Sequence, residues 1–382
     1  MNSNVNKIIG KTFLNIAKEL EKKDFGKTFN IGVTVLGSEL GTDHIIQAAE
    51  EDQRKLGVNV VLIGPKMDTY LDIVEVQTEE EAHHKLEELL FKKEIDAVVT
   101  MHYTFPIGVS TIGRVVTPTG KSMFIATTTG TTSTNKIEGM VKNTVYGKVV
   151  AKSCGIENPT IGILNIEGAK EVEKQLKKLV EKGYDLTFGQ SKRSDGGVAL
   201  RGNDLIMGSC DVVVTDSLTG NIIMKLFSSF NNGGKEEVVG YGYGPGIGFG
   251  YENKVFIVSR ASGANVVRGA IEYAAETLKG NINCVLKEEE EKLNKLNFND
   301  FLKENIKEKK VIAQTVKEIP KEIVTAQIAG VDIMELDNAV AYLKEKEVYS
   351  EAGMGCTGPI VMVNESKEEL ARKLLKEGEF LA

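Results

Sequence analysis

Short apolar runs alternate with amphipathic helical segments along most of the chain. The runs are nearly continuous in branched and aromatic residues, and most are followed by a polar or glycine-rich loop and then a helical pattern. The predicted strands cover residues 31–37, 58–64, 95–100, 122–129, 159–166, 210–216 and 254–259. Apolar strands that alternate with helices are typical of a mainly parallel sheet covered on both faces. The pattern therefore predicts an α/β fold.

The ends of the chain differ from this repeat. The first residues predict an amphipathic helix, and the charge-rich stretch 286–310 predicts helices with solvated faces. Short helices are expected to follow, and then a strand and a helix in which Ser366 and Glu369 fit a capping box and Gly378 a C-cap. We therefore expect an N-terminal helix over 1–27, an α/β domain over 28–295, a helical segment over 296–347 and a C-terminal βα unit over 348–382.

Composition narrows the choice of compartment and partners. The net charge of the 382 residues is -7, which argues against an extended anionic polymer as a partner. No apolar run approaches the ~20 residues that span a bilayer, and the N-terminus lacks the features of a signal peptide. Four cysteines without C-x-x-C spacing, and four histidines without H-x-x-x-H spacing or a Cys/His cluster, predict free thiols, no metal site and a cytoplasmic location.

Candidate ligand-binding residues follow the predicted strands. In an open parallel sheet, ligands bind beyond the carboxyl ends of the strands, where helix N-termini attract small anions. Hydroxyl, amide and cationic groups gather in these loops, most clearly in SLTGN ahead of the helix with Lys225. Some of these residues could instead only cap their helices. The phosphate-binding candidates are Ser217, Thr219, Gly220, Asn221, Lys225, Thr128, Thr129, Arg260 and Ser262.

Two other features leave alternatives open. The glycine–aromatic segment 240–254 is either a mobile flap over the site or an irregular excursion. His102 follows a predicted strand and is either a base or an ordinary polar contact. Cys210 and Cys284 are expected to be buried apolar residues, and Cys154 a loop residue without an activating group.

The closing stretch EAGMGCTGPIVMVN sets Cys356 among glycines. Gly353, Gly355 and Gly358 spell G-x-G-x-x-G, but the stretch follows a helical segment and opens a strand, the wrong context for a dinucleotide site. Glycines leave the thiol accessible, and the amides of Gly355 and Thr357 could stabilise a thiolate or an oxyanion. Cys356 is therefore a catalytic candidate, with a cysteine in a tight turn as the alternative.

The stretch DVVVTDSLTGNIIMK resembles the phosphate acyltransferases of bacterial phospholipid synthesis, and NPTIGILNI and SGANVVRGAIEYAA fit the same family. This similarity runs from about residue 28 to about residue 285. It implies a three-layer α/β/α fold related to isopropylmalate dehydrogenase and phosphotransacetylase. It also implies acyl transfer from a thioester to inorganic phosphate.

The closing thiol segment and LGSELGTD depart from that family and resemble alpha subunits of component C of the glycine/sarcosine/betaine reductase complex. This narrower resemblance implies that Cys356 carries an acetyl group that phosphate removes as acetyl phosphate, the last step of glycine, sarcosine or betaine reduction. It implies no cofactor beyond phosphate as co-substrate. The implied partners are a beta subunit, a selenoprotein acyl donor and further copies in an oligomer. The alternatives are a stand-alone acyl-carrier-protein:phosphate acyltransferase and a non-catalytic subunit that positions a partner enzyme.

Overall fold

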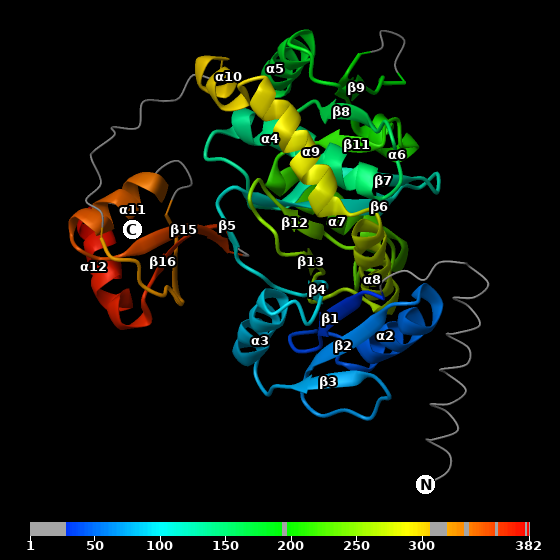
Figure 1. Ribbon diagram of the computed structural model, residues 1–382, viewed down its shortest axis with the longest axis vertical. Coiled ribbons are helices and arrows are strands. Elements are labelled where there is room, and N and C mark those ends of the chain that lie inside the picture. Colours follow the sequence, from blue (N-terminus) through cyan, green and yellow to red (C-terminus); the bar gives the residue numbers. More distant parts are fainter. Residues whose placement is uncertain are drawn as a thin grey trace.

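The computed structural model describes residues 28–192, 197–305, 319–331, 336–355, 358–378 and 380–381, so the helix predicted over residues 1–27 lies outside the described residues. The chain forms a large α/β part with a smaller C-terminal module beside it (Figure 1). The module consists of β14 (Ala326–Ala329), α11 (Leu336–Glu345), β15 (Ser350–Gly355), β16 (Gly358–Val363), the short turn η2 (Glu365–Lys367) and α12 (Glu368–Glu377).

One sheet runs through the α/β part in the order β10-β8-β11-β7-β6-β12-β13-β4-β1-β2-β3, with β9 beside β8. Most neighbouring strands are parallel, and the antiparallel pairs β6–β7, β6–β12 and β12–β13 lie near its centre. The strands are β1 (Asn30–Thr34), β2 (Asn59–Gly64), β3 (Asp72–Glu75), β4 (Ala97–Thr100), β6 (Val109–Val116), β7 (Ser122–Thr131), β8 (Thr160–Leu164), β9 (Thr187–Phe188), β10 (Ala199–Leu200), β11 (Val212–Val214), β12 (Gly244–Ile247) and β13 (Val255–Ile257). The predicted mainly parallel α/β sheet is confirmed.

Helices cover both faces of this sheet. Successive residues of a buried strand point to opposite faces, and accordingly Val212 and Val214 pack into one apolar cluster and Val213 into the other. One face is covered by α2 (Asp43–Leu56), α4 (Lys136–Ser153), α5 (Ala169–Glu181), α8 (Ala264–Lys279), α9 (Ile282–Lys295) and α10 (Phe298–Asn305). The other is covered by α3 (Glu79–Phe91), α6 (Gly202–Met207) and α7 (Ser217–Ser229), which is continued by the turn η1 (Phe230–Asn232). The result is a three-layer α/β/α arrangement.

Part of the glycine–aromatic segment 240–254 forms a strand, which neither the flap nor the irregular excursion predicted. Its residues Gly244–Ile247 form β12, which is buried in the sheet between β6 and β13. Gly244 has a φ of 88°, and a Cβ atom there would lie 1.7 Å from the carbonyl oxygen of Ile112. The glycine therefore lets neighbouring backbones approach closely, a role for which it is suited because it has no side chain.

The C-terminal module differs from the sequence-based expectation in three ways. Residues 326–329, expected within short helices, form strand β14, because alternate residues there are buried as β14 pairs with β16. A further strand, β15, precedes β16 and pairs with it in antiparallel fashion. The side chain of Asn364, and not a Ser366 capping box, accepts the N–H of Ser366 ahead of α12. The C-cap at Gly378 is confirmed.

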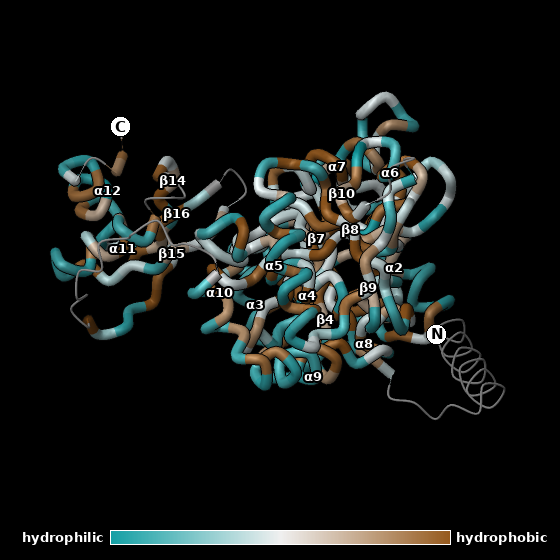
Figure 2. The backbone as a smooth tube through the Cα atoms, turned by 90° about the horizontal axis from the view of Figure 1, so that it is seen from above, coloured by the Kyte–Doolittle hydropathy of each residue, from teal (hydrophilic) through white to brown (hydrophobic). Residues whose placement is uncertain are grey.

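The module has its own apolar core and is tied to the larger part through a strand. Val361, Leu343 and Leu375 are fully buried in that core. In addition, β15 pairs in antiparallel fashion with β5 (Phe105–Pro106), which leads into the central strand β6. Figure 2 shows the module standing beside the α/β part. Among the described residues, no helix is both long enough and apolar enough to cross a membrane.

Candidate functional site

A cavity of about 750 Å³ opens where the module meets the α/β part. Its walls are the end of β7 with the loop that follows, the first turns of α4 and α7, and the facing ends of β15 and β16. The lining residues are Thr127, Thr128, Thr129, Gly130, Thr131, Thr132, Ser133, Thr134, Lys136, Gly139, Met140, Asn143, Asp216, Ser217, Leu218, Thr219, Asn221, Met354, Gly355 and Pro359.

The first turn of α7 gives the cavity one anion-attracting wall. Asp216 is the N-cap, and its carboxylate accepts the N–H of Thr219 at 2.9 Å. The first amides of a helix have no carbonyl partner within it and sit at the positive end of the helix dipole. The lining side chain of Ser217 adds a hydroxyl at this end. Because Gly220 has no side chain, α7 can approach the carbonyl oxygen of Thr127, 1.8 Å from where a Cβ atom would lie.

A second helix begins at the same cavity. Asn135 caps α4, and its side-chain oxygen accepts the N–H groups of Ile137 and Glu138 at 3.0 and 3.2 Å. Lys136 follows this cap, lines the cavity, and has its ammonium 3.4 Å from the carboxylate of Asp216. Two helix N-termini and one ammonium group thus converge on one space, which suits a phosphate-sized anion.

Two threonines of the lining, Thr128 and Thr129, differ in how deeply they are buried. Thr128 is fully buried, and its hydroxyl donates to the carbonyl oxygen of Tyr243 at 2.8 Å and bonds to the hydroxyl of Thr111. The amide of Asn221 donates to the carbonyl oxygen of Thr128 at 3.3 Å. These contacts hold β7 against α7 and β6, while Thr129 is only partly buried at the cavity wall.

The thiol segment borders this cavity. Gly355 ends β15 and pairs with Gly358, which begins β16. Met354, Gly355 and Pro359 all line the cavity. Cys356 and Thr357 lie between these strands in the sequence and fall outside the described residues. Residues on both sides of Cys356 in the sequence therefore line the same cavity as the first turns of α4 and α7.

Three of the predicted phosphate-binding residues lie elsewhere, next to carboxylates of the protein itself. Lys225 has its ammonium 3.6 Å from the buried Glu237, and the hydroxyl of Ser262 donates to the same side chain at 2.8 Å. The guanidinium of Arg260 pairs with Glu79 at 2.6 Å. The cavity thus brings together Ser217, Thr219, Asn221, Thr128, Thr129 and Gly355, with Gly220 behind the wall, but not Lys225, Arg260 or Ser262.

His102 lies outside the cavity. It lines a much smaller space of about 10 Å³ with Glu79 and His83, at the ends of β1 and β4. Burial, together with the charges of His83 and Arg260, lowers the pKa of His102, so its neutral form is favoured. The assignment of a base role to His102 stays a prediction.

The described cysteines all have thiols with raised pKa values. Burial raises the pKa of Cys154 and of Cys210 to about 12. The buried position predicted for Cys210 is confirmed, whereas Cys284 is exposed, contrary to expectation, because it lies on the solvent side of α9. A hydrogen bond with Glu288 raises the pKa of Cys284. None of these three thiols lines the cavity.

Sequence reasoning missed Lys136 and the cap residue Asp216. The available clue was that TTTGTTSTNK, like DSLTGN, connects an apolar strand to a helix through hydroxyl residues and an N-cap. Two equivalent strand–loop–helix joints in neighbouring strands of one sheet place both helix N-termini at one edge. Met354 and Pro359 could not be found in this way, because they reach the cavity only through the packing of the module.

Comparison with known proteins gives the family. The sequence model of the fatty acid synthesis protein family matches residues 29–362. The chain is 51% identical to the glycine/sarcosine/betaine reductase complex component C subunit alpha of Peptoclostridium acidaminophilum, over all of both chains. It is 24% identical to a phosphate acyltransferase of Thermotoga neapolitana over 51% of this chain and 68% of that protein.

Solved structures are more distant. A 4-hydroxythreonine-4-phosphate dehydrogenase from Klebsiella pneumoniae superposes with a TM-score of 0.42 at 12% identity, covering 65% of this chain and 99% of that one. No functional inference follows from a similarity at that level. The full-length match and the family model decide the assignment. The chain therefore belongs to the fatty acid synthesis protein family and, within it, to the component C alpha subunits of the glycine/sarcosine/betaine reductase complex.

Proposed function

We propose that the chain transfers an acetyl group from a thioester on Cys356 to inorganic phosphate and releases acetyl phosphate, as the last step of glycine, sarcosine or betaine reduction. The observation that carries the proposal is the composition of the cavity. The residues on both sides of Cys356 line the same space as two helix N-termini and Lys136. This shared lining supports a nucleophile and an anion site in one cavity.

In this mechanism the phosphate binds between the first turns of α4 and α7. The positive ends of both helix dipoles, the ammonium of Lys136 and the hydroxyls of Ser217 and Thr219 would surround it. Lys136 would exchange its contact with Asp216, 3.4 Å away, for one with the dianion. The proposal assigns Asn221 and Thr128 to holding α7 against β7, because their hydrogen bonds join these elements.

The acetyl group reaches Cys356 by thioester exchange. The thiolate of Cys356 attacks the donor carbonyl carbon, and the donor leaves with the electron pair of its own bond to that carbon. A phosphate oxygen then attacks the same carbonyl carbon, the C–S bond breaks, and the sulfur departs as thiolate. The amides of Gly355 and Thr357 are the proposed stabilisers of the oxyanion that forms at each attack.

The thiol of Cys356 must be partly deprotonated near neutral pH for this mechanism. A free cysteine has a pKa of about 8.5, and positive groups and helix N-termini lower it. The cavity supplies such groups in Lys136 and the first turns of α4 and α7. The three described cysteines lie away from these groups and have raised pKa values, as expected of thiols that play no part in the transfer.

The partners belong to the proposal as well. The relative of 51% identity is named as one subunit of one component of a reductase complex. We propose that a beta subunit of component C associates with this chain and that a selenoprotein supplies the acyl group. Phosphate is the co-substrate, with no further cofactor.

The test measures arsenate-dependent hydrolysis of acetyl phosphate by the purified chain. Acetyl arsenate hydrolyses spontaneously, so turnover reports acetyl transfer in both directions. We expect Cys356→Ser to lose at least about 100-fold in rate, because a serine hydroxyl is a poorer nucleophile and leaving group than a thiolate. Cys284→Ser, a change at an exposed thiol, is the control and should keep full activity.

The results also separate the alternatives. Retention of full activity by Cys356→Ser would remove the thiol mechanism and favour direct transfer from an acyl-carrier protein. Absence of turnover in the wild-type chain would favour a subunit that only positions a partner enzyme. Circular dichroism of each variant shows whether its fold is intact.

A further inference from the structure

Asn143 is a buried polar residue in the wall of the cavity. It belongs to α4, is only 3% exposed and lines the cavity together with Met140, which precedes it by about one turn of the same helix. Lys136 lies about one turn before Met140. Residues at these spacings share one face of a helix, so the face of α4 that begins with Lys136 continues along the cavity to Asn143.

Two hydroxyl groups fix the orientation of the Asn143 carboxamide. Its oxygen accepts the hydroxyl of Ser110 on β6 at 2.9 Å and the hydroxyl of Thr132 in the loop after β7. Both hydroxyls are buried and make no other hydrogen bond within the described part of the chain, so each needs an acceptor. The oxygen of a carboxamide accepts hydrogen bonds, whereas its nitrogen only donates. The nitrogen of Asn143 therefore faces away from this pair of hydroxyls.

That nitrogen has no hydrogen-bond partner among the described residues. It is not enclosed by the protein either, in contrast to the hydroxyl oxygen of Thr215, which is both buried and without a partner. Because Asn143 lines the cavity, the space that its nitrogen borders is the cavity itself. A buried polar residue thus presents an oriented N–H donor to whatever the cavity binds.

We propose that the amide of Asn143 donates a hydrogen bond to the carbonyl oxygen of the acyl group that is transferred in the cavity. This assignment rests on the proposed function. The carboxamide is neutral and its neighbour Met140 is apolar, a combination that suits a carbonyl group with a short alkyl chain. The phosphate already has the ammonium of Lys136 and the positive ends of the α4 and α7 dipoles.

The donor acts most strongly while the carbonyl carbon is attacked. When a sulfur or a phosphate oxygen forms its bond to that carbon, an electron pair of the C=O bond moves onto the oxygen, which becomes an oxyanion. The pair returns to the C=O bond as the leaving group departs. A donor that is oriented beforehand stabilises this oxyanion without having to reorganise. Ser110 and Thr132 hold Asn143 in that orientation, so they are positioning residues.

The test measures arsenate-dependent hydrolysis of acetyl phosphate by the full chain and by two variants. Asn143→Leu removes the donor at similar size, and Asn143→Asp removes it but keeps oxygens that accept the hydroxyls of Ser110 and Thr132. Both should lose roughly 100-fold in turnover number, and the Michaelis constant for arsenate should change by less than about 3-fold in Asn143→Leu. Thr144→Val is the matched control and should keep the wild-type turnover number. Thr144 is the next residue of α4, is fully buried, donates to the carbonyl oxygen of Met140 at 2.9 Å and does not line the cavity.

Infrared spectroscopy of the acetylated chain separates this role from a structural one. A hydrogen bond weakens the C=O bond, so the isotope-labelled acetyl carbonyl should absorb at a higher frequency in both Asn143 variants than in the wild type. An unchanged frequency would overturn the assignment, and with a loss of turnover it would give Asn143 a structural role. Circular dichroism checks the fold, and Asn143→Asp keeps the test open if Asn143→Leu does not fold.

The outcomes also distinguish this assignment from the proposed function. Full turnover in folded Asn143 variants, beside an active wild type, would overturn the assignment and leave acetyl transfer in place. A wild-type chain that does not turn over acetyl phosphate would overturn both.

Discussion

Among the described residues that line the cavity, Lys136 is the one with a cationic side chain. It follows the N-cap of α4, lines the cavity and faces Asp216 across the gap between α4 and α7. A hydrogen bond to a charged group contributes about 1.5–3 kcal/mol, which corresponds to roughly 10- to 100-fold in affinity. The residue therefore gives the anion site its clearest test.

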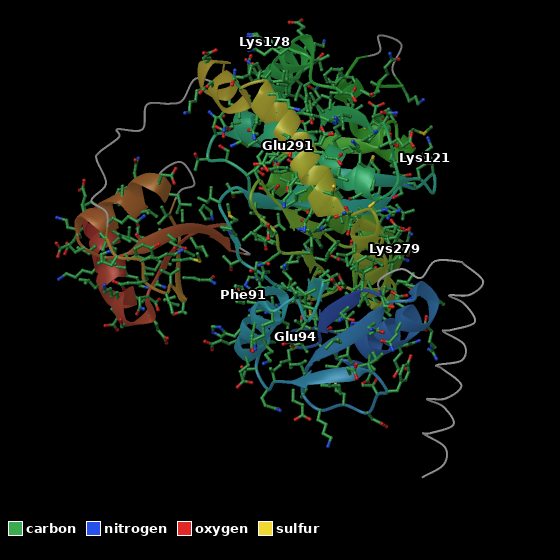
Figure 3. All side chains as sticks on the ribbon, viewed as in Figure 1. Phe91, Glu94, Lys121, Lys178, Lys279 and Glu291 are labelled. Carbon is green, nitrogen blue, oxygen red and sulfur yellow. The ribbon has the colours of Figure 1, made fainter. Side chains whose placement is uncertain are left out.

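We expect Lys136→Met to raise the Michaelis constant for phosphate or arsenate by at least about 10-fold, with a smaller change in turnover number. The matched control is Lys121→Met, because Lys121 lies at the turn between β6 and β7, away from the cavity (Figure 3). The Michaelis constant of Lys121→Met should equal that of the wild type. Equal Michaelis constants in Lys136→Met and the wild type would show that phosphate binds elsewhere.

Sequence reasoning at the residue scale located one wall of the cavity. The SLTGN loop was recognisable because it follows an apolar strand and opens a helix, and its residues Ser217, Thr219 and Asn221 do line the cavity. Lys225 and Arg260 were misleading, because sequence alone does not show that they lie outside the cavity, beside Glu237 and Glu79. Which cation is left for a ligand depends on tertiary packing.

At the scale of elements, the packing of α7 on β7 fixes where the helix N-terminus points. We expect Gly220→Ala to destabilise the fold by about 3 kcal/mol, because its added methyl group would overlap the carbonyl oxygen of Thr127. The displaced helix should also lower acetyl transfer. Chemical denaturation measures the first effect and the arsenate assay the second.

Gly202→Ala is the control for that substitution. Gly202 begins α6, and nothing in the described part of the chain lies within 4 Å of a Cβ atom placed there. The free energy of unfolding of the Gly202→Ala chain should stay within about 0.5 kcal/mol of the wild-type value. Equal stability of both variants would mean that α7 does not pack tightly on β7.

Helices α4 and α9 are joined by a buried ion cluster. The carboxylate of Glu289 on α9 is fully buried and accepts hydrogen bonds from Lys148 at 2.9 Å, Tyr184 at 2.8 Å and Lys292 at 2.8 Å. Burial alone would raise its pKa, but these hydrogen bonds and the lysine charges outweigh burial and lower the pKa to about 2. Its contribution to stability is therefore fully present above the usual pKa of 4.5 and is lost as pH falls toward 2.

We expect Glu289→Gln to cost about 3 kcal/mol of unfolding free energy at neutral pH, because Lys148 would keep its charge in a buried place without the carboxylate. Denaturation between pH 4.5 and 2 should show a shallower loss of stability than in the wild type. Glu291→Gln, an exposed change on the same helix (Figure 3), should match the wild type at every pH. A Glu289→Gln chain as stable as the wild type would contradict the role of this cluster.

At the scale of the whole molecule, the α/β part could be predicted better than the module. Continuous apolar strands such as β2 and β8 stand out because they are buried on both faces. Strand β14 does not stand out in this way. Four residues with alternate burial do not distinguish a strand from a helix until the partner strand β16 is known. The pairing of β5 with β15, which joins the module to the α/β part, could not be predicted from the local pattern of apolar and polar residues.

Binding at the cavity should involve both parts of the molecule at once. Acetyl phosphate added to the Cys356→Ser chain should slow amide hydrogen exchange in residues 127–134 of the α/β part and in residues 350–363 of the module, because both segments line the cavity. Exchange in α2, none of whose residues lines the cavity, serves as the internal control. Protection confined to one of the two segments would contradict a shared site.

Acetyl transfer through Cys356 requires that its sulfur carry the acetyl group. The direct measurement is mass spectrometry of peptides from the wild-type chain mixed with acetyl phosphate and quenched in acid. We expect an acetyl group on the peptide that contains Cys356, and we expect it to be lost when phosphate is added before the quench. Acetyl transfer to arsenate at full rate without any acetylated form of that peptide would contradict it.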